Sequence, residues 1–201
     1  MSDPAKPQPA SRKERDYARH HQDILDVAES LFAEKGYYQA TMQMIADRAE
    51  FSVGYLYKHF SGKEEMYQEM VHFHLTTIDA LMQKVAALGL GPLDEIHRTY
   101  QEFCSHFNRH RDFMRIFHEE IGGDFCDLAE GKKKHFQDLK IKLTRAQELG
   151  ELKPYDPTLL TAAIQGATKE LFAELAERPG DNPFDSLPDV LFKLLIDPLR
   201  N

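Results

Sequence analysis

The chain has 201 residues, 42% of them hydrophobic, which suits a folded protein with a sizeable core and excludes a chain that is disordered throughout. No run of about 18 apolar residues occurs, so the sequence predicts no membrane-spanning helix and no membrane partner. The formal net charge of −8 argues against a nucleic-acid partner as long as the chain is taken as a whole.

The charge is unevenly divided along the chain. Residues 1–63 hold nine Lys or Arg and nine Asp or Glu, so residues 64–201 carry the whole negative excess. A neutral N-terminal part with a few well-placed cations can still bind DNA phosphates, although more weakly than a basic one.

The expected compartment follows from two further features. Cys104 and Cys126 are the only cysteines, too few for a disulfide framework in a chain of this size. The first residues lack the basic and then apolar layout of a secretory signal. We therefore expect a protein of the reducing cytoplasm.

The first elements in chain order are an arm and an amphipathic helix. Residues 1–15 begin with a proline-rich, apolar-poor segment and are expected to be a disordered arm. The helix that follows ends at Gly36, a typical C-terminal cap. Its apolar face has helical spacing and consists of Ile24, Leu25, Ala28, Leu31 and Phe32.

Two short helices come next, separated by a turn of about three residues. Thr41 is a good N-cap for the first, which holds Ile45 and Ala46, and Ser52 is a good N-cap for the second, which runs through Phe60. A short helix, a turn and a second short helix form the layout of a DNA-reading helix-turn-helix. The sequence therefore predicts a three-helix DNA-binding domain over residues 16–62.

Residues 63–201 continue the helical pattern. Ser61 and Glu64 form a predicted capping box for a longer helix. Glycine and proline mark later breaks, Gly131 is a candidate interruption, and Pro157 suits the first position of a helix. Strand-type alternation is absent. The predicted fold class is all-α, with about nine helices and a larger C-terminal helical domain over residues 63–201.

The N-terminal segment resembles the TetR family of transcriptional regulators. The resemblance covers roughly residues 22–70 and includes Ile45-Ala46, Ser52 and the ending Tyr57-x-His59-Phe60-x-x-Lys63. That ending is far more specific than a bare helix-turn-helix pattern. The family implies a dimeric repressor that binds a double-stranded, near-palindromic operator and is released by a small ligand.

The resemblance also implies roles for single residues. Thr41 would touch a phosphate, and Gln43 sits where some relatives read a base. Base edges would be met by Val53, Gly54 and Tyr55. Phosphates would be gripped by Tyr57, Lys58, His59 and Lys63.

Two positions depart from the family pattern. Relatives usually have glycine in the turn where this chain has Glu50, which costs roughly 1 kcal/mol if the turn needs a positive φ. Relatives often have a small residue or threonine in place of Tyr55, so no base preference can be transferred. The alternative for Tyr55 is that it folds back onto the small core near Tyr57 and Phe51.

The C-terminal domain carries the implied ligand-binding and dimerisation functions. Dimerisation would use the last two helices, whose apolar stripes could instead fill the monomer core. The stripes are Leu160, Ala163, Ile164, Ala167, Leu171 and Leu175, then Leu187, Val190, Leu191, Leu194 and Leu195. A small apolar or aromatic effector would bind among aromatic side chains, for which ordinary core packing is the alternative. These are Tyr100, Phe103, Phe107, Phe113, Phe117 and Phe136.

Two other functions compete with this interpretation. His106 and His110 have a spacing that can hold a metal, and with Glu119 they could serve a metal-dependent all-α enzyme. No nucleophile–base motif or Gly-rich phosphate loop supports catalysis, so we expect no enzyme, no metal and no cofactor. An architectural DNA-binding protein without a ligand is the third possibility.

Overall fold

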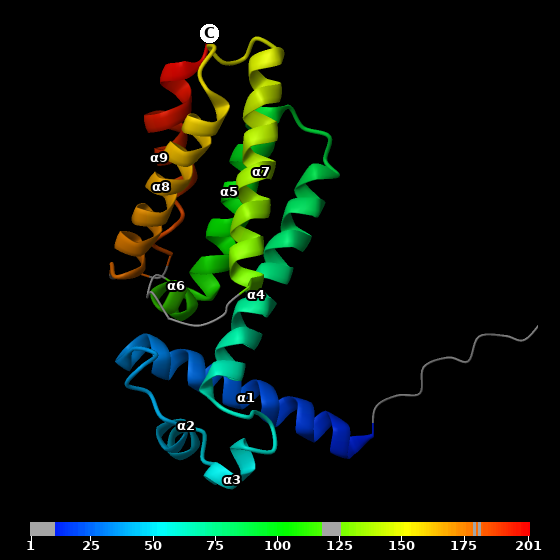
Figure 1. Cartoon of the computed structure of the whole chain (residues 1–201), viewed down its shortest axis with the longest axis vertical. Coiled ribbons are helices and arrows are strands. Elements are labelled where there is room, and N and C mark those ends of the chain that lie inside the picture. The colour runs from blue at the N-terminus through cyan, green and yellow to red at the C-terminus, as the bar shows by residue number, and fades with distance from the viewer. Residues whose placement is uncertain (1–10, 118–125, 179, 181) are drawn as a thin grey trace, which may run out of the picture. The chain divides into compact units, whose positions relative to one another are not determined.

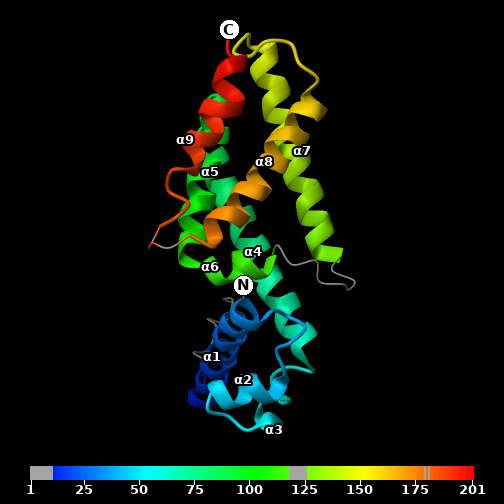
Figure 2. The same cartoon turned by 90° about the vertical axis from the view of Figure 1, so that its left-hand side faces the viewer.

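The computed structural model describes residues 11–117, 126–178, 180 and 182–201. Over these ranges the chain is all-α, as the sequence predicts, with nine α-helices and one isolated β-bridge between Leu152 and Arg200. Contacts divide the chain into two compact units, Met1–Met66 and Tyr67–Asn201, which can be followed by colour in Figures 1 and 2. In these described ranges, no helix is both long enough and apolar enough to cross a membrane.

The N-terminal unit contains α1 (Arg12–Lys35), α2 (Met42–Arg48) and α3 (Val53–Leu56). All five residues of the predicted apolar face of α1 are buried, and Gly36 ends the helix with a φ of 81°. The expected arm over residues 1–15 is too long, because α1 already begins at Arg12. Ser11 and Glu14 form a capping box there that the sequence analysis overlooked.

Both predicted caps of the helix-turn-helix are present. The Thr41 side chain accepts the backbone N–H of Met44, and the Ser52 side chain accepts the backbone N–H of Tyr55. The second helix is shorter than expected, since α3 ends at Leu56 and the chain continues to Phe60 as a turn. Leu56 and Phe60 are nonetheless buried, so this turn belongs to the small core.

Six further helices follow, arranged in Figures 1 and 2 as long helices side by side with the short α6 at one end of the C-terminal unit. They are α4 (Lys63–Ala86), α5 (Pro92–Arg109), α6 (Arg111–Phe117), α7 (Cys126–Glu148), α8 (Pro157–Ala176) and α9 (Leu187–Leu191). The chain then ends in a π-helical turn, Phe192–Ile196, and a 3₁₀ turn, Asp197–Leu199. Pro157 takes the first turn of α8 as predicted, with Asp156 as the N-cap.

Two details of these helices differ from the sequence prediction. Gly131 does not interrupt α7; a Cβ at this position would lie 2.8 Å from Cδ2 of Leu75 on α4, so glycine permits a close approach of the two helices. The N–H of Ser61 is bonded by Glu65 at 2.5 Å and not by Glu64. This bond holds the pKa of the Glu65 carboxyl below its ordinary value.

Glu50 is the non-glycine residue with a positive φ, 59°, in the described part of the chain. It lies in the turn between α2 and α3, where the resemblance leads us to expect glycine. Glu50→Gly should raise the free energy of unfolding by roughly 1 kcal/mol, because a side chain disfavours this backbone conformation. Thermal denaturation should show an increase in Tm of about 2–4 °C.

Glu50→Gln is the matched control, since it removes the charge and keeps the side chain. We expect the Tm of Glu50→Gln to stay close to that of the wild type. Equal increases for the two variants would attribute the effect to charge and not to the backbone.

Candidate functional site

The helix-turn-helix presents most of the predicted DNA-contacting residues to solvent. Two backbone bonds shape its turn, from the N–H of Phe51 to the carbonyl of Ala46 and from the N–H of Glu50 to the carbonyl of Asp47. Ile45 and Leu56 are fully buried and join α2 to α3. Of the predicted residues only His59 is buried. Val53, Tyr55 and Lys63 are half-exposed, and the exposed ones are Thr41, Gln43, Gly54, Tyr57 and Lys58.

Tyr55 points back toward α1. Its ring stacks on Phe51 with a centroid distance of 5.0 Å, and its hydroxyl is hydrogen-bonded to Nδ1 of His20 at 2.9 Å. This is the fold-back arrangement considered as the alternative to base reading. The sequence could not show it, because the partner His20 lies 35 residues earlier in the chain.

His59 is buried as well, with 7% of its surface exposed. Its ring stacks on Tyr17 at a centroid distance of 4.1 Å. Burial, followed by the neighbouring His21 and His20, lowers its pKa, so the neutral imidazole is favoured. The structure places this side chain in the core of the unit and not on the exposed surface where the expected phosphate contact would form.

The Lys63 ammonium group is hydrogen-bonded within the protein. Its Nζ donates to the backbone carbonyls of Tyr37, Tyr38 and Ala40 at 2.8, 3.2 and 3.2 Å. A lysine ammonium has three N–H donors, so these bonds use all of them. Burial lowers the pKa of Lys63. The ammonium group also lies over the Tyr37 ring, 4.5 Å from its centroid, which is a cation–π contact that favours the charged form. In this arrangement Lys63 holds the loop after α1 and has no donor left for a phosphate.

Sequence reasoning missed the first half of α1 as part of the site. Besides His20, Tyr17 reaches the second helix of the motif, donating its hydroxyl to the carbonyl of Lys58 at 3.1 Å. Both lie outside the apolar face of α1 that periodicity identifies. Their spacing of three residues on one helix was the available signal.

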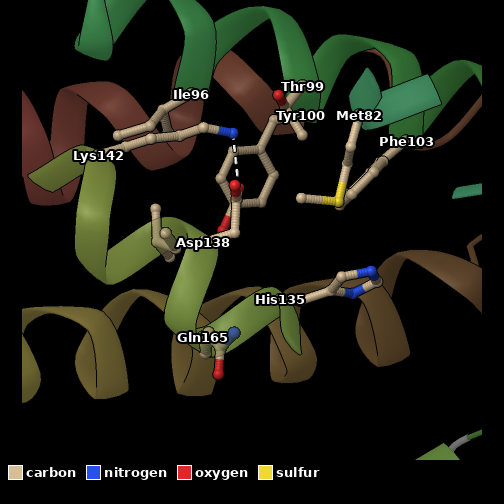
Figure 3. A pocket seen from close by; sticks show the side chains of 10 residues that line it. Met82, Ile96, Thr99, Tyr100, Phe103, His135, Asp138, Lys142 and Gln165 are labelled. Atoms are coloured by element: carbon tan, nitrogen blue, oxygen red, sulfur yellow. Dashed lines mark hydrogen bonds and ion pairs between the residues drawn. The ribbon is translucent and has the colours of Figure 1, made fainter. Parts of the chain in front are cut away.

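A cavity of about 50 Å³ lies in the C-terminal unit, enclosed by side chains of α4, α5, α7 and α8 (Figure 3). Two of the six predicted effector-binding residues, Tyr100 and Phe103, line it. The other lining residues are Met82, Ile96, Thr99, His135, Asp138, Leu139, Lys142 and Gln165.

Of the other aromatic residues that were predicted to bind the effector, none whose side chain the structure describes lines this cavity. Phe107 and Phe113 are buried and stack on each other at a centroid distance of 6.5 Å, so they follow the core-packing alternative. Phe136 is half-buried but does not line the cavity. The side chain of Phe117 lies outside the described residues.

The wall of the cavity carries an ion-pair cluster that the sequence did not reveal. Lys142 on α7 is buried and bonds Asp138 at 2.5 Å and Glu95 on α5 at 3.1 Å. Figure 3 shows Lys142 and Asp138 facing each other beside the ring of Tyr100. Burial raises the pKa of Tyr100 to about 12, so this phenol stays protonated. The cavity therefore combines apolar walls with a polar edge.

The predicted histidine pair gains an unexpected third member. Nε2 of His106 lies 2.9 Å from Nδ1 of His74 on α4, and the His106 and His110 rings are 4.6 Å apart. Burial is the main cause that lowers the pKa of His106 to about 3, so this imidazole is neutral near pH 7. Because Nε2 of His106 is engaged with His74, metal binding through that atom requires the bond to break. Glu119, the third residue of the enzymatic alternative, lies outside the described residues.

The predicted apolar stripes of α8 and the last helix divide between core and surface. Ile164, Leu187 and Leu191 are buried. Of the stripe residues, Val190 is 36% and Leu194 is 64% exposed. Leu159, which the predicted stripe did not include, is 70% exposed. The exposed Gly166 has no atom within 4 Å of its would-be Cβ. The outer side of these helices thus has an apolar surface with room for a close neighbour.

Known proteins resemble both units. Residues 24–70 match the sequence profile described as bacterial regulatory proteins, tetR family. The N-terminal segment of the chain thus carries a TetR-family DNA-binding domain. The HTH-type transcriptional repressor KstR2 of Mycolicibacterium smegmatis is 30% identical over 123 residues, 61% of this chain and 56% of that protein. The alignments span only about half the length of the first KstR2 relatives.

Solved structures of TetR-family regulators share the fold of this chain. KstR2 of Mycobacterium tuberculosis, a ketosteroid transcriptional regulator, superposes with a TM-score of 0.80 at 21% identity over 96% of this chain and 97% of that one. AibR in complex with isovaleryl coenzyme A and operator DNA has a TM-score of 0.72 at 20% identity over 88% of this chain and 98% of that one. At these identities the likeness establishes the fold alone.

The two lysines of the motif should behave differently. Lys63→Met should lower the free energy of unfolding by about 1–2 kcal/mol, because three backbone carbonyls lose a charged donor. The dependence of DNA affinity on salt should stay nearly unchanged. Thermal denaturation and DNA titrations at several salt concentrations measure both effects.

Lys58→Met is the matched comparison, because Lys58 is exposed. It should leave the Tm unchanged and lower the slope of log K against log salt by about one unit. A reduced salt slope with an unaltered Tm for Lys63→Met would restore Lys63 as a phosphate contact.

Proposed function

We propose that this chain is a DNA-binding transcriptional regulator, specifically a dimeric repressor of the cytoplasm that a small apolar ligand releases from a near-palindromic operator. The observation that carries the proposal is the helix-turn-helix, with capped helices and an exposed set of polar and aromatic side chains. The name of KstR2, a transcriptional repressor, supports it. Neither the enzymatic nor the architectural alternative gains support from a comparable feature.

The DNA contact assigned here differs from the one expected from the sequence. Thr41, Gln43, Val53 and Gly54 remain candidates to approach base edges and phosphates, and Tyr57 and Lys58 remain candidate phosphate ligands. Tyr55, His59 and Lys63 support the reading segment from behind. Recognition of the DNA sequence then depends on fewer side chains. The backbone around Gly54 is therefore important, because it must come close to the base edges in the major groove.

The exposed apolar surface of α8 and the last helix supports a two-fold dimer. Leu159 and Leu194 lie on its exposed side, and Gly166 allows a second backbone to come close. A dimer has one reading helix per subunit and therefore suits two half-sites spaced by about 10 base pairs or a multiple.

Selection from a randomised duplex library should enrich a near-palindromic sequence with that spacing. Leu194→Glu should leave the helical content intact, shift light scattering to a monomer and weaken binding to the selected duplex by at least an order of magnitude, because a charge at an apolar interface is costly.

Ile141→Glu provides the matched control, since Ile141 is a 65% exposed residue on α7. It should stay dimeric and bind normally. A wild-type protein that is monomeric at micromolar concentration, or a selected site without symmetry, would contradict the dimeric mechanism.

The effector is proposed to enter the cavity of the C-terminal unit. At about 50 Å³ the cavity is far below the roughly 300–1,000 Å³ of typical ligand pockets, so binding must displace its walls. One wall residue, Met82, belongs to α4, the helix that begins at Lys63 beside the reading segment. Ligand-driven movement of α4 is therefore the proposed route to lower DNA affinity.

Isovaleryl-CoA and stearoyl-CoA are suitable first probes, because AibR and FadR of Bacillus subtilis were solved with these molecules. One of them, or a small aromatic compound from a panel, should dissociate the complex of the chain with its selected duplex. Met82→Phe, which fills the cavity, should reduce that response at least tenfold with DNA affinity unchanged. Fluorescence anisotropy of labelled DNA measures both.

Leu88→Phe, at an exposed residue just beyond α4, is the control and should respond like the wild type. Equal responses of Met82→Phe and wild type would exclude this cavity as the effector site. A DNA complex that resists every probe is the result that the architectural alternative requires.

A further inference from the structure

A cluster of three histidines lies in the C-terminal unit, where α5 ends. His74 belongs to α4, His106 lies in the last turn of α5, and His110 is the residue that caps the end of α5. In the sequence the last two, four residues apart, form too small a ligand set to predict a metal. The fold adds His74, which lies 32 residues before His106. A ligand set of two thereby becomes a set of three.

The three imidazole rings form a nearly regular triangle. The distance between ring centroids is 5.1 Å from His74 to His106, 5.0 Å from His74 to His110 and 4.6 Å from His106 to His110. A zinc ion lies about 2.0–2.1 Å from an imidazole nitrogen and hence about 3.2 Å from the ring centroid. Three imidazoles on one ion, at angles of about 90–110°, therefore have centroids about 4.5–5.2 Å apart. The observed triangle has these dimensions.

The ring nitrogens are also close to one another. Nδ1 of His74 lies 2.9 Å from Nε2 of His106, and a ring nitrogen of His110 lies within 4.8 Å of one of His74. Two nitrogens on one zinc ion are about 2.8–3.4 Å apart. The first pair thus already has the spacing of two ligands. The side chain of His110 is half-buried at the end of its helix, so a rotation can bring it to the same ion.

The bond between His74 and His106 is compatible with metal binding. A neutral imidazole has one N–H and one acceptor nitrogen, so one of the two rings donates to the other. When both nitrogens bind an ion, the proton of the donating nitrogen moves to the other nitrogen of its own ring. Each imidazole remains neutral, which is the form that binds metals.

The surroundings of the cluster are aromatic. His74 and His106 are only 1% and 2% exposed. The ring of Phe113 stacks on His74 at a centroid distance of 3.7 Å, and that of Phe107 lies 5.1 Å from His106. Apolar side chains would fill this space without the cost of burying polar atoms, so packing alone does not call for imidazoles here. An apolar shell also limits the access of water to a bound metal.

We propose that His74, His106 and His110 bind one divalent transition-metal ion, represented by Zn²⁺, with a water molecule or a small anion in the fourth position. Imidazole nitrogen suits zinc, copper and nickel, whereas magnesium and calcium take oxygen ligands. Three protein ligands with one open position form a recurring zinc geometry. The bound ion joins α4 to the end of α5. The inference concerns the C-terminal unit and does not depend on the proposed DNA-binding function.

The test uses the full-length chain, freed of metal by a chelator that is then removed. Calorimetric titration with zinc chloride should show one ion per chain and a dissociation constant in the micromolar range or below, and magnesium chloride should not bind. Free zinc at about one hundred times the dissociation constant should raise the Tm by about 5–10 °C. Cobalt(II) should give the visible absorption bands of a tetrahedral ion, and zinc should abolish them.

His110→Asn should keep the helical content of the wild type, because this half-buried side chain lies at the end of α5. It should weaken zinc binding at least about tenfold, a loss that even outer partners of a metal ligand can cause, and remove the cobalt bands. His106→Asn should have the same two effects. His72→Asn is the matched control, since His72 is an exposed histidine on the helix that carries His74. It should bind zinc like the wild type.

Three outcomes overturn the proposal. A wild type that takes up no zinc leaves the three histidines as core residues. Unchanged zinc affinity in His110→Asn removes this residue from the ligand set. Equal weakening by His72→Asn and His110→Asn attributes the zinc to surface histidines. If His106→Asn does not fold, the zinc affinity and the cobalt spectrum of His110→Asn decide between the site and its absence.

Discussion

The reading helix depends on contacts supplied by α1. α3 has only four residues, and a helix of that length has no stability of its own, because nucleation costs more than one turn of hydrogen bonds returns. Leu56 anchors it from within the core. From α1, His20 bonds Tyr55, the third residue of α3, and Tyr17 bonds the carbonyl of Lys58 in the turn that follows α3. The orientation of any DNA-reading side chain is therefore set by α1.

This support draws polar residues into the core. His59 and Tyr55 pack against aromatic rings, and Lys63 spends its donors on the loop that follows α1. These three side chains could contact DNA if they were exposed, but here they stabilise the N-terminal unit. The positive φ of Glu50 in the adjacent turn shows that this compact packing also imposes a local conformational cost.

The C-terminal unit shows a different balance between packing and function. Lys142 is a buried cation held by two carboxylates from α5 and α7, an arrangement that contributes little net stability once the loss of hydration is counted. It does fix the register of the two helices at the edge of the cavity. A ligand that entered this cavity, as proposed above, would have to disturb this cluster.

The sequence by itself determined most of the helices and their caps, because helical periodicity and capping chemistry act over a few neighbouring residues. The resemblance of residues 22–70 to the TetR family also came from the sequence alone. Ile24 to Phe32, Thr41, Ser52 and Pro157 all occupy the positions that their local patterns predict. The helix start at Arg12 and the bond from Ser61 to Glu65 also depend on neighbouring residues. The proline-rich start of the chain suggested an arm over residues 1–15, and the spacing of Ser61 and Glu64 suggested a different capping box.

Only the tertiary structure decided which polar side chains stay exposed to solvent and which pack against the rest of the fold. Tyr55 is separated from His20 by 35 residues, Lys63 from Tyr37 by 26, and Tyr100 from Thr168 by 68. An exposed-looking polar residue becomes a core residue when such a partner arrives, because a buried polar group is stable only with its hydrogen bonds made. Gly131 illustrates the same limit: in the sequence it resembles a helix break, while in the fold it lets α7 approach Leu75 on α4.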